Sequence, residues 1–156
     1  MDDMTERAET AAAGTNKQLA QRLFEEAVQN GNLAVIDELF APDAEFEGPA
    51  PAQETHYRDH IAALHRGLQD VTCELERIIA EDDRVAVRAR IGGTNTGEWE
   101  GLRASGRDVS FIAVTIFEFR DGRVVRCVEA RDNITIWVQV GDVPAHLRPY
   151  AEQAGA

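Results

Sequence analysis

Apolar residues alternate with polar ones through most of the second half of the chain, and this periodicity constrains the fold more than any other feature. The alternation covers four segments: Val71–Ala80, Arg84–Ile91, Arg107–Phe119 and Arg123–Asp132. A period of two is typical of β-strands, because successive side chains of a strand point to opposite faces of the sheet. Asp121-Gly122, between the last two segments, favours a tight hairpin turn. We therefore predict consecutive, hairpin-linked strands.

The first half of the sequence shows helical spacing instead. Apolar residues that recur every three or four positions predict helices over 15–30, 33–41 and 55–69. A short strand, Ala44–Gly48, is expected between the second and third of these helices. Helices followed by hairpin-linked strands are the order of an α+β fold. A long sheet that curls over one layer of helices would enclose a cone-shaped interior.

The 156 residues are enough for one domain with one hydrophobic core. Residues 1–14 are polar and rich in alanine, and we expect them to form a disordered tail. The domain itself is expected to span residues 15–143, and residues 144–156 are expected to form a C-terminal tail.

Acidic residues outnumber basic ones by 28 to 16, which gives the chain a formal net charge of −12. This charge repels nucleic acid and anionic membrane surfaces, so neither is an expected partner. The sequence has no apolar run long enough to span a membrane, and its beginning lacks the apolar region of a signal peptide. We therefore expect a cytoplasmic protein.

The two cysteines, Cys73 and Cys127, lie in apolar strand patterns and are expected to be buried thiols. Two isolated cysteines are too few for a zinc site, and the four histidines lack the spacing of metal ligands. The sequence therefore predicts no metal site.

The last predicted strand ends in a carboxylate. One face of this strand is predicted to carry the even-numbered residues Val124, Val128 and Ala130, and Asp132 continues the same row. Burial beside an apolar row disfavours the charged form and raises the pKa of a carboxyl group, which is one way to obtain a general acid or base. The alternative is a structural role, in which Asp132 caps the following turn or pairs with a neighbouring arginine.

A longer series of residues then matches a known family pattern. The matching positions, in order, are Gly93-Thr94, Gly97, Gly101, Gly106, Val109, Phe117, Gly122, Val124-Val125, Asp132, Gln139 and Gly141. This series resembles the SnoaL-like polyketide cyclase family, which belongs to the nuclear transport factor 2-like superfamily. Residues 30–49 resemble the opening helices and first strand of the family more loosely, so the resemblance covers about residues 16–143.

The resemblance implies a cone-shaped, cystatin-like α+β barrel, with a curved antiparallel or mixed sheet packed on three N-terminal helices. It also implies a cavity for a small apolar or aromatic ligand, no cofactor, and homodimers or homotetramers. Family cyclases close a ring by intramolecular aldol condensation of a polyketide ester, and the family's acid/base aspartate maps onto Asp132. Histidines that are frequent in the family are replaced here by Asn95, Glu47 and Cys127.

Three polar residues are candidates for the site, each with a structural alternative. Asn95 can donate a hydrogen bond to a developing enolate, or it can be a turn residue. Glu47 is either a second titrating group at the cavity mouth or a solvated strand residue. His60 either lines the pocket or lies on the surface of the third helix.

Three aromatic residues complete the candidate site. Trp99 and Trp137 offer broad apolar faces and one N–H donor each, which suit a flat polycyclic ligand. Their alternative role is packing in the core or at a subunit interface. Phe111 lies on the strand expected to face the cavity, where it either contacts the ligand or fills the space.

These features favour a cofactor-independent cyclase or isomerase that uses an aspartate general acid/base on an apolar, polyketide-like carbonyl compound. One alternative is a non-catalytic small-molecule-binding protein of the same superfamily, in which Asp132 only hydrogen-bonds a ligand. Another is an assembly protein whose cavity is vestigial. An enzyme or a binding protein should have an open cavity of roughly several hundred Å³.

Overall fold

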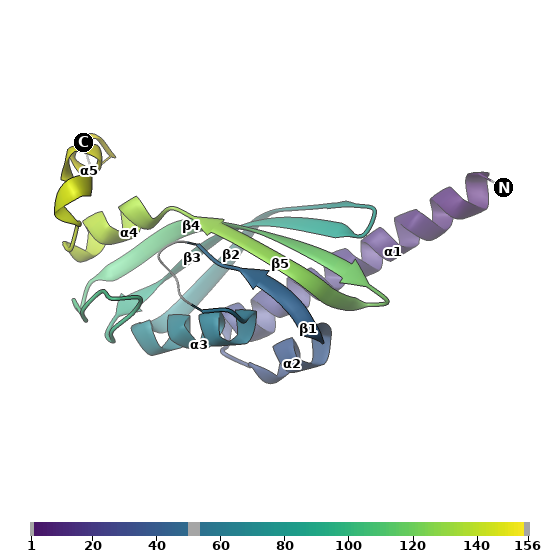
Figure 1. Cartoon of the computed structure of the whole chain (residues 1–156), viewed down its shortest axis with the longest axis horizontal. Coiled ribbons are helices and arrows are strands. Elements are labelled where there is room, and N and C mark those ends of the chain that lie inside the picture. Colours follow the sequence, from purple (N-terminus) through teal and green to yellow (C-terminus); the bar gives the residue numbers. More distant parts are fainter. Residues whose placement is uncertain (1, 50–53, 155–156) are drawn as a thin grey trace.

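The computed structural model of the protein describes residues 2–49 and 54–154, which form an α+β fold with one curved sheet and a layer of helices (Figure 1). The strands are β1 (Phe40–Glu47), β2 (Leu68–Glu81), β3 (Arg84–Asn95), β4 (Asp108–Arg120) and β5 (Arg123–Arg131). Their spatial order is β1-β5-β4-β3-β2, with β1 parallel to β5 and all other neighbours antiparallel. The predicted fold, a mixed sheet on N-terminal helices, is confirmed.

Helices precede and follow the sheet. Those before and between the first strands are α1 (Asp2–Arg22), the π-helical η1 (Leu23–Gln29), α2 (Ala34–Leu39) and α3 (Tyr57–Gly67). Those after β5 are α4 (Asn133–Val140), the short 3₁₀ helix η2 (Ala145–Leu147) and α5 (Arg148–Ala154). Figure 1 shows α1, α2 and α3 on one side of the sheet, whereas α4 and α5 lie at the end of the molecule opposite the N-terminus, where Gln139 of α4 hydrogen-bonds the backbone of Ser110 in β4.

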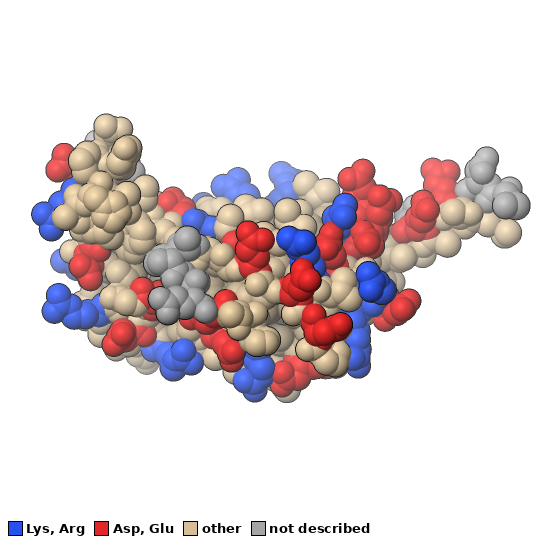
Figure 2. Space-filling view, viewed as in Figure 1, with Lys and Arg blue, Asp and Glu red and all other residues tan. Residues whose placement is uncertain are grey.

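The first helix begins earlier than the sequence predicted. We expected a tail over residues 1–14, but α1 is helical from Asp2 and extends beyond the sheet, with acidic side chains along it (Figures 1 and 2). Thr15, where the first helix was expected to begin, lies inside the helix, and its Oγ1 donates a hydrogen bond to the carbonyl oxygen of Ala11 at 3.1 Å. The alanine-rich composition explains the extension, because alanine has the highest helix propensity.

The core lies between the helices and the inner face of the sheet. The inward residues of β4 are all buried, namely Val109, Phe111, Ala113, Thr115, Phe117 and Phe119. On the outer face of the same strand, Val114 and Ile116 keep 40% and 42% of their surface exposed. In a single chain, β4 is therefore buried on the face that packs against the helices and partly exposed on the opposite face.

The hairpin between β4 and β5 formed as predicted, but β5 contains a bulge. Asp121 and Gly122 both have positive φ, 51° and 75°, as a type I′ turn requires. The register then shifts, because Glu118 pairs with Arg126 whereas Phe119 pairs with Val124, which leaves Val125 as an extra residue. An extra residue reverses the parity of everything that follows it.

The bulge overturns the predicted faces of β5. Beyond it, Cys127, Glu129 and Arg131 point into the molecule, and Val128 and Ala130 belong to the other face. The predicted row from Val124 through Val128 to Asp132 is therefore wrong. The inward row carries a carboxylate and a guanidinium instead.

Candidate functional site

Helix α3 places a histidine in the core. Its buried face includes Tyr57, His60, Ile61 and Leu64, which follow the helical spacing of three and four residues. The His60 side chain is only 4% exposed. The rings of Phe46 and Tyr57 lie 5.2 and 6.5 Å from its ring, centroid to centroid. His60 is therefore a buried residue and not a surface one.

The inner face of the sheet holds one side of the imidazole. Nε2 of His60 lies 3.1 Å from Oε1 of Glu129, which is itself buried. The hydroxyl of Thr115, on β4, donates to the other oxygen of Glu129 at 3.3 Å. Because a carboxylate accepts hydrogen bonds, a neutral imidazole makes this contact in the tautomer that carries its hydrogen on Nε2 and a lone pair on Nδ1.

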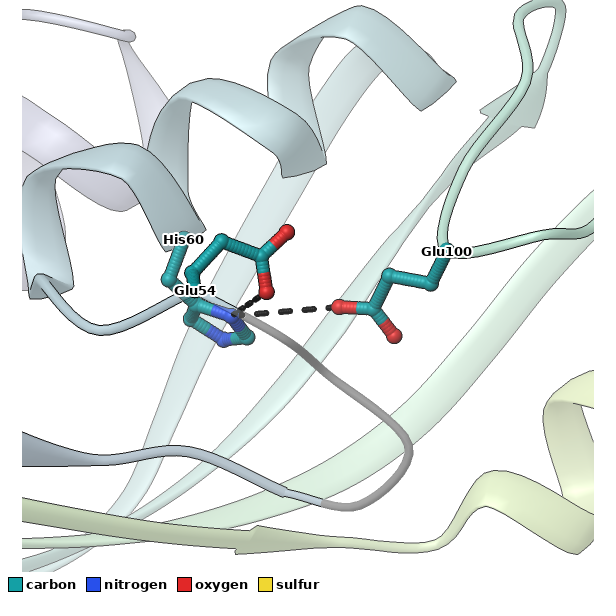
Figure 3. A group of neighbouring side chains, drawn as sticks. All are labelled: Glu54, His60 and Glu100. Carbon is teal, nitrogen blue, oxygen red and sulfur yellow. Dashed lines mark ion pairs between the residues drawn. The ribbon is translucent and has the colours of Figure 1, made fainter.

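That lone pair faces two more carboxyl groups. Nδ1 of His60 lies 3.8 Å from Oε2 of Glu54 and 3.8 Å from Oε1 of Glu100 (Figure 3). The Glu100 side chain is 6% exposed and that of Glu54 is 20% exposed. The three residues come from the segment before α3, from α3 itself and from the loop between β3 and β4.

A tight turn aims Glu100 inward. Trp99 and Leu102 exchange two backbone hydrogen bonds of 2.9 Å, and Glu100 between them has a positive φ of 50°. Few residues other than glycine, asparagine and aspartate adopt this conformation, which costs about 1 kcal/mol or more. A Cβ atom at Gly67, the last residue of α3, would lie 2.2 Å from Cβ of Trp99. The turn thus packs directly against the end of the helix.

Arg131 is the buried cation of the site. Its guanidinium makes an ion pair with Oε2 of Glu100, and the two side chains are 3% and 6% exposed. The guanidinium carbon lies 4.8 Å from the centre of the Trp99 ring and 5.8 Å from that of Phe111. Burial lowers the pKa of Arg131 to about 10, and the charge of Glu54 acts in the opposite direction.

We call His60, Glu54, Glu100, Glu129 and Arg131 the His60 cluster. Several buried polar atoms in and beside it make no hydrogen bond to another described residue. They are Oε2 of Glu54, the Tyr57 hydroxyl, Nδ1 of His60, Nε1 of Trp99 and Oε1 of Glu100. Buried polar groups are normally paired, so a concentration of unpaired ones points to a place where something else binds.

Asp132 does not lie in this cluster. It is exposed and is the N-cap residue of α4, where its carboxylate accepts hydrogen bonds from the backbone nitrogen and the hydroxyl of Thr135, at 3.1 and 2.5 Å. The predicted burial of Asp132 is wrong, because the bulge in β5 turns it to the outer side. The capping role, which the sequence left open, is confirmed.

Asn95 is fully engaged in holding the β3–β4 loop. Its Nδ2 donates to the carbonyl oxygens of Gly67 and Gly97, at 3.2 and 2.9 Å, and its Oδ1 accepts from the backbone nitrogen and hydroxyl of Ser105, at 2.9 and 2.8 Å. Its amide has therefore used both hydrogens and both lone pairs. The structure favours the turn role over donation to an enolate.

The remaining candidates divide into two groups. Glu47 has a side chain that is 71% exposed, 3.7 Å from Arg126, and Trp137 is partly buried against the core on α4. Neither belongs to the His60 cluster. Trp99 and Phe111, by contrast, are buried with ring centres 5.7 Å apart and flank Arg131. The structure thus brings together His60, Trp99 and Phe111 out of the predicted set.

The carboxyl groups of the cluster were missed because no local pattern marks them. Glu54 and Glu100 lie in loops, where an acidic residue is ordinarily solvated. Regular alternation puts Glu129 and Arg131 on the face opposite Val124, and only the extra residue at Val125 turns them inward. The strand itself contains a signal for these residues. Cys127 is an apolar residue two positions before Glu129, so both side chains lie on the same, inward face of β5.

A hollow of about 510 Å³ lies next to the cluster, between α2, β1 and α3. Its apolar wall includes Ile36, Phe40, Phe46 and Tyr57. Phe46 and Tyr57 are also the rings nearest to the imidazole of His60, so the hollow and the cluster share these two residues. The volume is within the range of small-molecule sites.

The chain matches the SnoaL-like polyketide cyclase family over residues 18–140 and therefore belongs to it. No curated protein matches the chain. No helix within the described residues is both long and apolar enough to cross a membrane.

Solved structures agree with this assignment. AclR, a putative hydroxylase from Streptomyces galilaeus, is 25% identical with a TM-score of 0.75, over 85% of this chain and 99% of AclR. A putative SnoaL-like polyketide cyclase from Jannaschia sp. CCS1 is 26% identical with a TM-score of 0.74, over 85% of this chain and 95% of that one. IdmH, a putative polyketide cyclase from Streptomyces antibioticus, is 27% identical with a TM-score of 0.68, over 81% and 98%.

Proposed function

We propose that the protein catalyses a proton transfer on an apolar carbonyl compound, in a ring closure or an isomerisation, with His60 as the acid/base group. The family and its solved relatives support a cyclase-like reaction. The observation that carries the proposal is the buried imidazole whose Nε2 is held by Glu129 while Nδ1 has no hydrogen-bond partner among the described residues.

We propose the following steps for the reaction. Nδ1 removes a proton from the carbon next to a carbonyl group, and the resulting enolate attacks a second carbonyl carbon of the same molecule. A carbon–carbon bond forms, and the alkoxide takes the proton back from the imidazolium. No redox partner is required. A positioned base contributes about 10²–10⁴-fold to the rate, and holding both ends of one molecule together contributes further.

Carboxyl groups lie close to both ring nitrogens of His60. Glu129 accepts from Nε2, while Glu54 and Glu100 lie 3.8 Å from Nδ1. A positive imidazolium is therefore surrounded by negative charge at low solvent exposure, where electrostatic interactions are stronger than in water. This arrangement favours the step that takes the proton from the substrate.

Deuterium exchange tests the proposal without knowledge of the natural substrate. Aromatic β-keto esters and 1,3-diketones are incubated with the protein in D₂O, and incorporation at the activated carbon is followed by NMR above the uncatalysed rate. We expect His60→Gln to lower the protein-dependent rate by about 10²-fold or more. Asp132→Asn keeps a good N-cap residue and should leave the rate unchanged.

The control for histidine itself is His56→Gln, since His56 is an exposed residue with a carboxylate, Asp59, at the same 3.8 Å distance. A loss of exchange in Asp132→Asn with His60→Gln still active would return the base role to Asp132. Tight binding of these compounds without any exchange would favour the non-catalytic binding protein instead.

Self-association is part of the same proposal. Val114 and Ile116 form an exposed apolar row on the outer face of β4, which a second copy can cover. We expect a homodimer or homotetramer by light scattering after size-exclusion chromatography. Val114→Lys should shift the mass to that of one chain, and a native protein already monomeric at micromolar concentration contradicts this part.

A further inference from the structure

Three atoms of the His60 cluster form a set of possible metal ligands. Oε2 of Glu54, Nδ1 of His60 and Oε1 of Glu100 all lie within 4.8 Å of one another (Figure 3). Each is buried, and none makes a hydrogen bond to another described residue. The His60 side chain is 4% exposed and that of Glu100 is 6% exposed, so these two groups are largely removed from solvent.

The groups behind these atoms are arranged as in metal sites. A metal-binding histidine usually donates its other ring N–H to a carboxylate, which fixes the tautomer and raises the basicity of the ligand nitrogen. Glu129 accepts this hydrogen bond from Nε2 of His60 and is itself held by Thr115. Arg131 holds the oxygen of Glu100 that faces away from His60. Two of the three ligands are therefore oriented by buried partners.

The charge of the cluster also calls for a cation. Three carboxyl groups, on Glu54, Glu100 and Glu129, share one guanidinium, that of Arg131. When the three carboxyl groups are ionised and the imidazole is neutral, the cluster has two more negative than positive charges. Uncompensated buried charge is costly, and a divalent cation would balance it.

We propose that Glu54, His60 and Glu100 bind one divalent first-row transition-metal ion, of which Zn²⁺ is the representative. One imidazole nitrogen with two carboxylate oxygens suits such ions, whereas Mg²⁺ and Ca²⁺ prefer oxygen ligands alone. Ligands of a tetrahedral Zn²⁺ lie roughly 3.4 Å apart, given metal–ligand distances of about 2.1 Å. The 3.8 Å separations from Nδ1 therefore need only a small contraction.

This site does not rest on the proposed proton transfer, and the two uses of His60 exclude each other. The Nδ1 lone pair accepts either a proton or a metal ion. Metal binding should therefore suppress the deuterium exchange that depends on His60, and a chelator should restore it. The site gives the protein a means of control by transition-metal ions.

The test is metal binding by the whole protein after removal of bound ions with a chelator. Co²⁺ replaces Zn²⁺ as a probe, because its visible absorption reports ligand number and geometry. We expect one Co²⁺ per chain, displaced by Zn²⁺ and not by Mg²⁺ or Ca²⁺. His60→Gln should weaken binding by at least ~100-fold, and Glu129→Gln, which affects only the orientation of His60, by ~10-fold.

Two further variants guard against loss of the fold. Glu54→Gln removes a ligand at the most exposed of the three positions and should weaken binding with an unchanged circular dichroism spectrum. His56→Gln, at the exposed histidine, should bind as the native chain does. Absence of a Co²⁺ band, or equal binding by His60→Gln and the native chain, overturns the metal site. Neither result touches the proton-transfer proposal, which the exchange rate in metal-free solution tests separately.

Discussion

Two buried polar side chains, those of Asn95 and His60, differ in how completely they are hydrogen-bonded. Asn95 is 0% exposed and uses all of its donors and acceptors on Gly67, Gly97 and Ser105. His60 is 3% exposed, and one ring nitrogen has no such bond within the described residues. The first group stabilises a loop, whereas the second keeps bonding capacity that the fold does not use.

The difference separates structural from functional polar residues. A buried group with all its bonds made adds to stability, and one with bonds unmade costs about 1–3 kcal/mol. Proteins retain such costs mainly where a ligand, an ion or a proton provides the missing partner. Burial alone therefore does not identify a site, and hydrogen-bond satisfaction is the more informative measure.

The largest expected loss of stability concerns Asn95, whose side chain makes all of its hydrogen bonds. Asn95→Ala should lower the free energy of unfolding by about 4 kcal/mol, because four hydrogen bonds of the buried amide, each worth about 1 kcal/mol, are lost together. Urea denaturation measures the change. Asn32→Ala, at an exposed position, is the control and should stay within about 0.5 kcal/mol of the native value. A small loss for Asn95→Ala would remove the contrast between the two groups.

A somewhat smaller loss is expected from the ion pair inside the His60 cluster. Glu100→Gln leaves the buried guanidinium of Arg131 without its countercharge, so we expect a destabilisation of about 3 kcal/mol. Glu98, two residues earlier in the same loop, is exposed, and Glu98→Gln serves as the matched control. If both variants unfold at the same urea concentration, Arg131 does not depend on Glu100 in the way described.

The third prediction concerns pH and the unpaired hydroxyl of Tyr57. Burial raises the pKa of Tyr57 well above 10.0, and the neighbouring thiol of Cys127 and carboxylate of Glu129 add to the increase. The folded state thus holds this proton more tightly than the unfolded state. The resulting stability is present below pH 10 and is lost as the pH rises further, because the native state then binds more protons.

Tyr57 can be observed alone, since Tyr150 is the one other tyrosine of the chain. In Tyr150→Phe, the ultraviolet absorbance of the phenolate should appear at higher pH in the folded protein than in urea. Adding Glu129→Gln should move the folded titration to lower pH, because one of its causes is removed. Coincident titrations in the folded and unfolded states would show that the phenol is not desolvated.

Much of the architecture could be predicted because it depends on local patterns. The alternation over 71–132 and the Asp121-Gly122 turn predicted the hairpins, and the apolar stripe of α3 predicted its buried face. The family pattern added the order of the elements. The site was predicted poorly, because a single extra residue at Val125 exchanged the faces of β5 and the alternating pattern of the sequence does not mark such a bulge.

The sequence by itself determined the periodicities, the turns and the family, since each depends on residues close together in the chain. Only the tertiary structure decided that Glu54, His60, Glu100 and Glu129 meet, because they come from separate segments. Their approach depends on the curvature of the sheet and the register of its strands, not on spacing. Distance in space governs electrostatics and metal binding, and it is fixed only when the helices pack on the sheet.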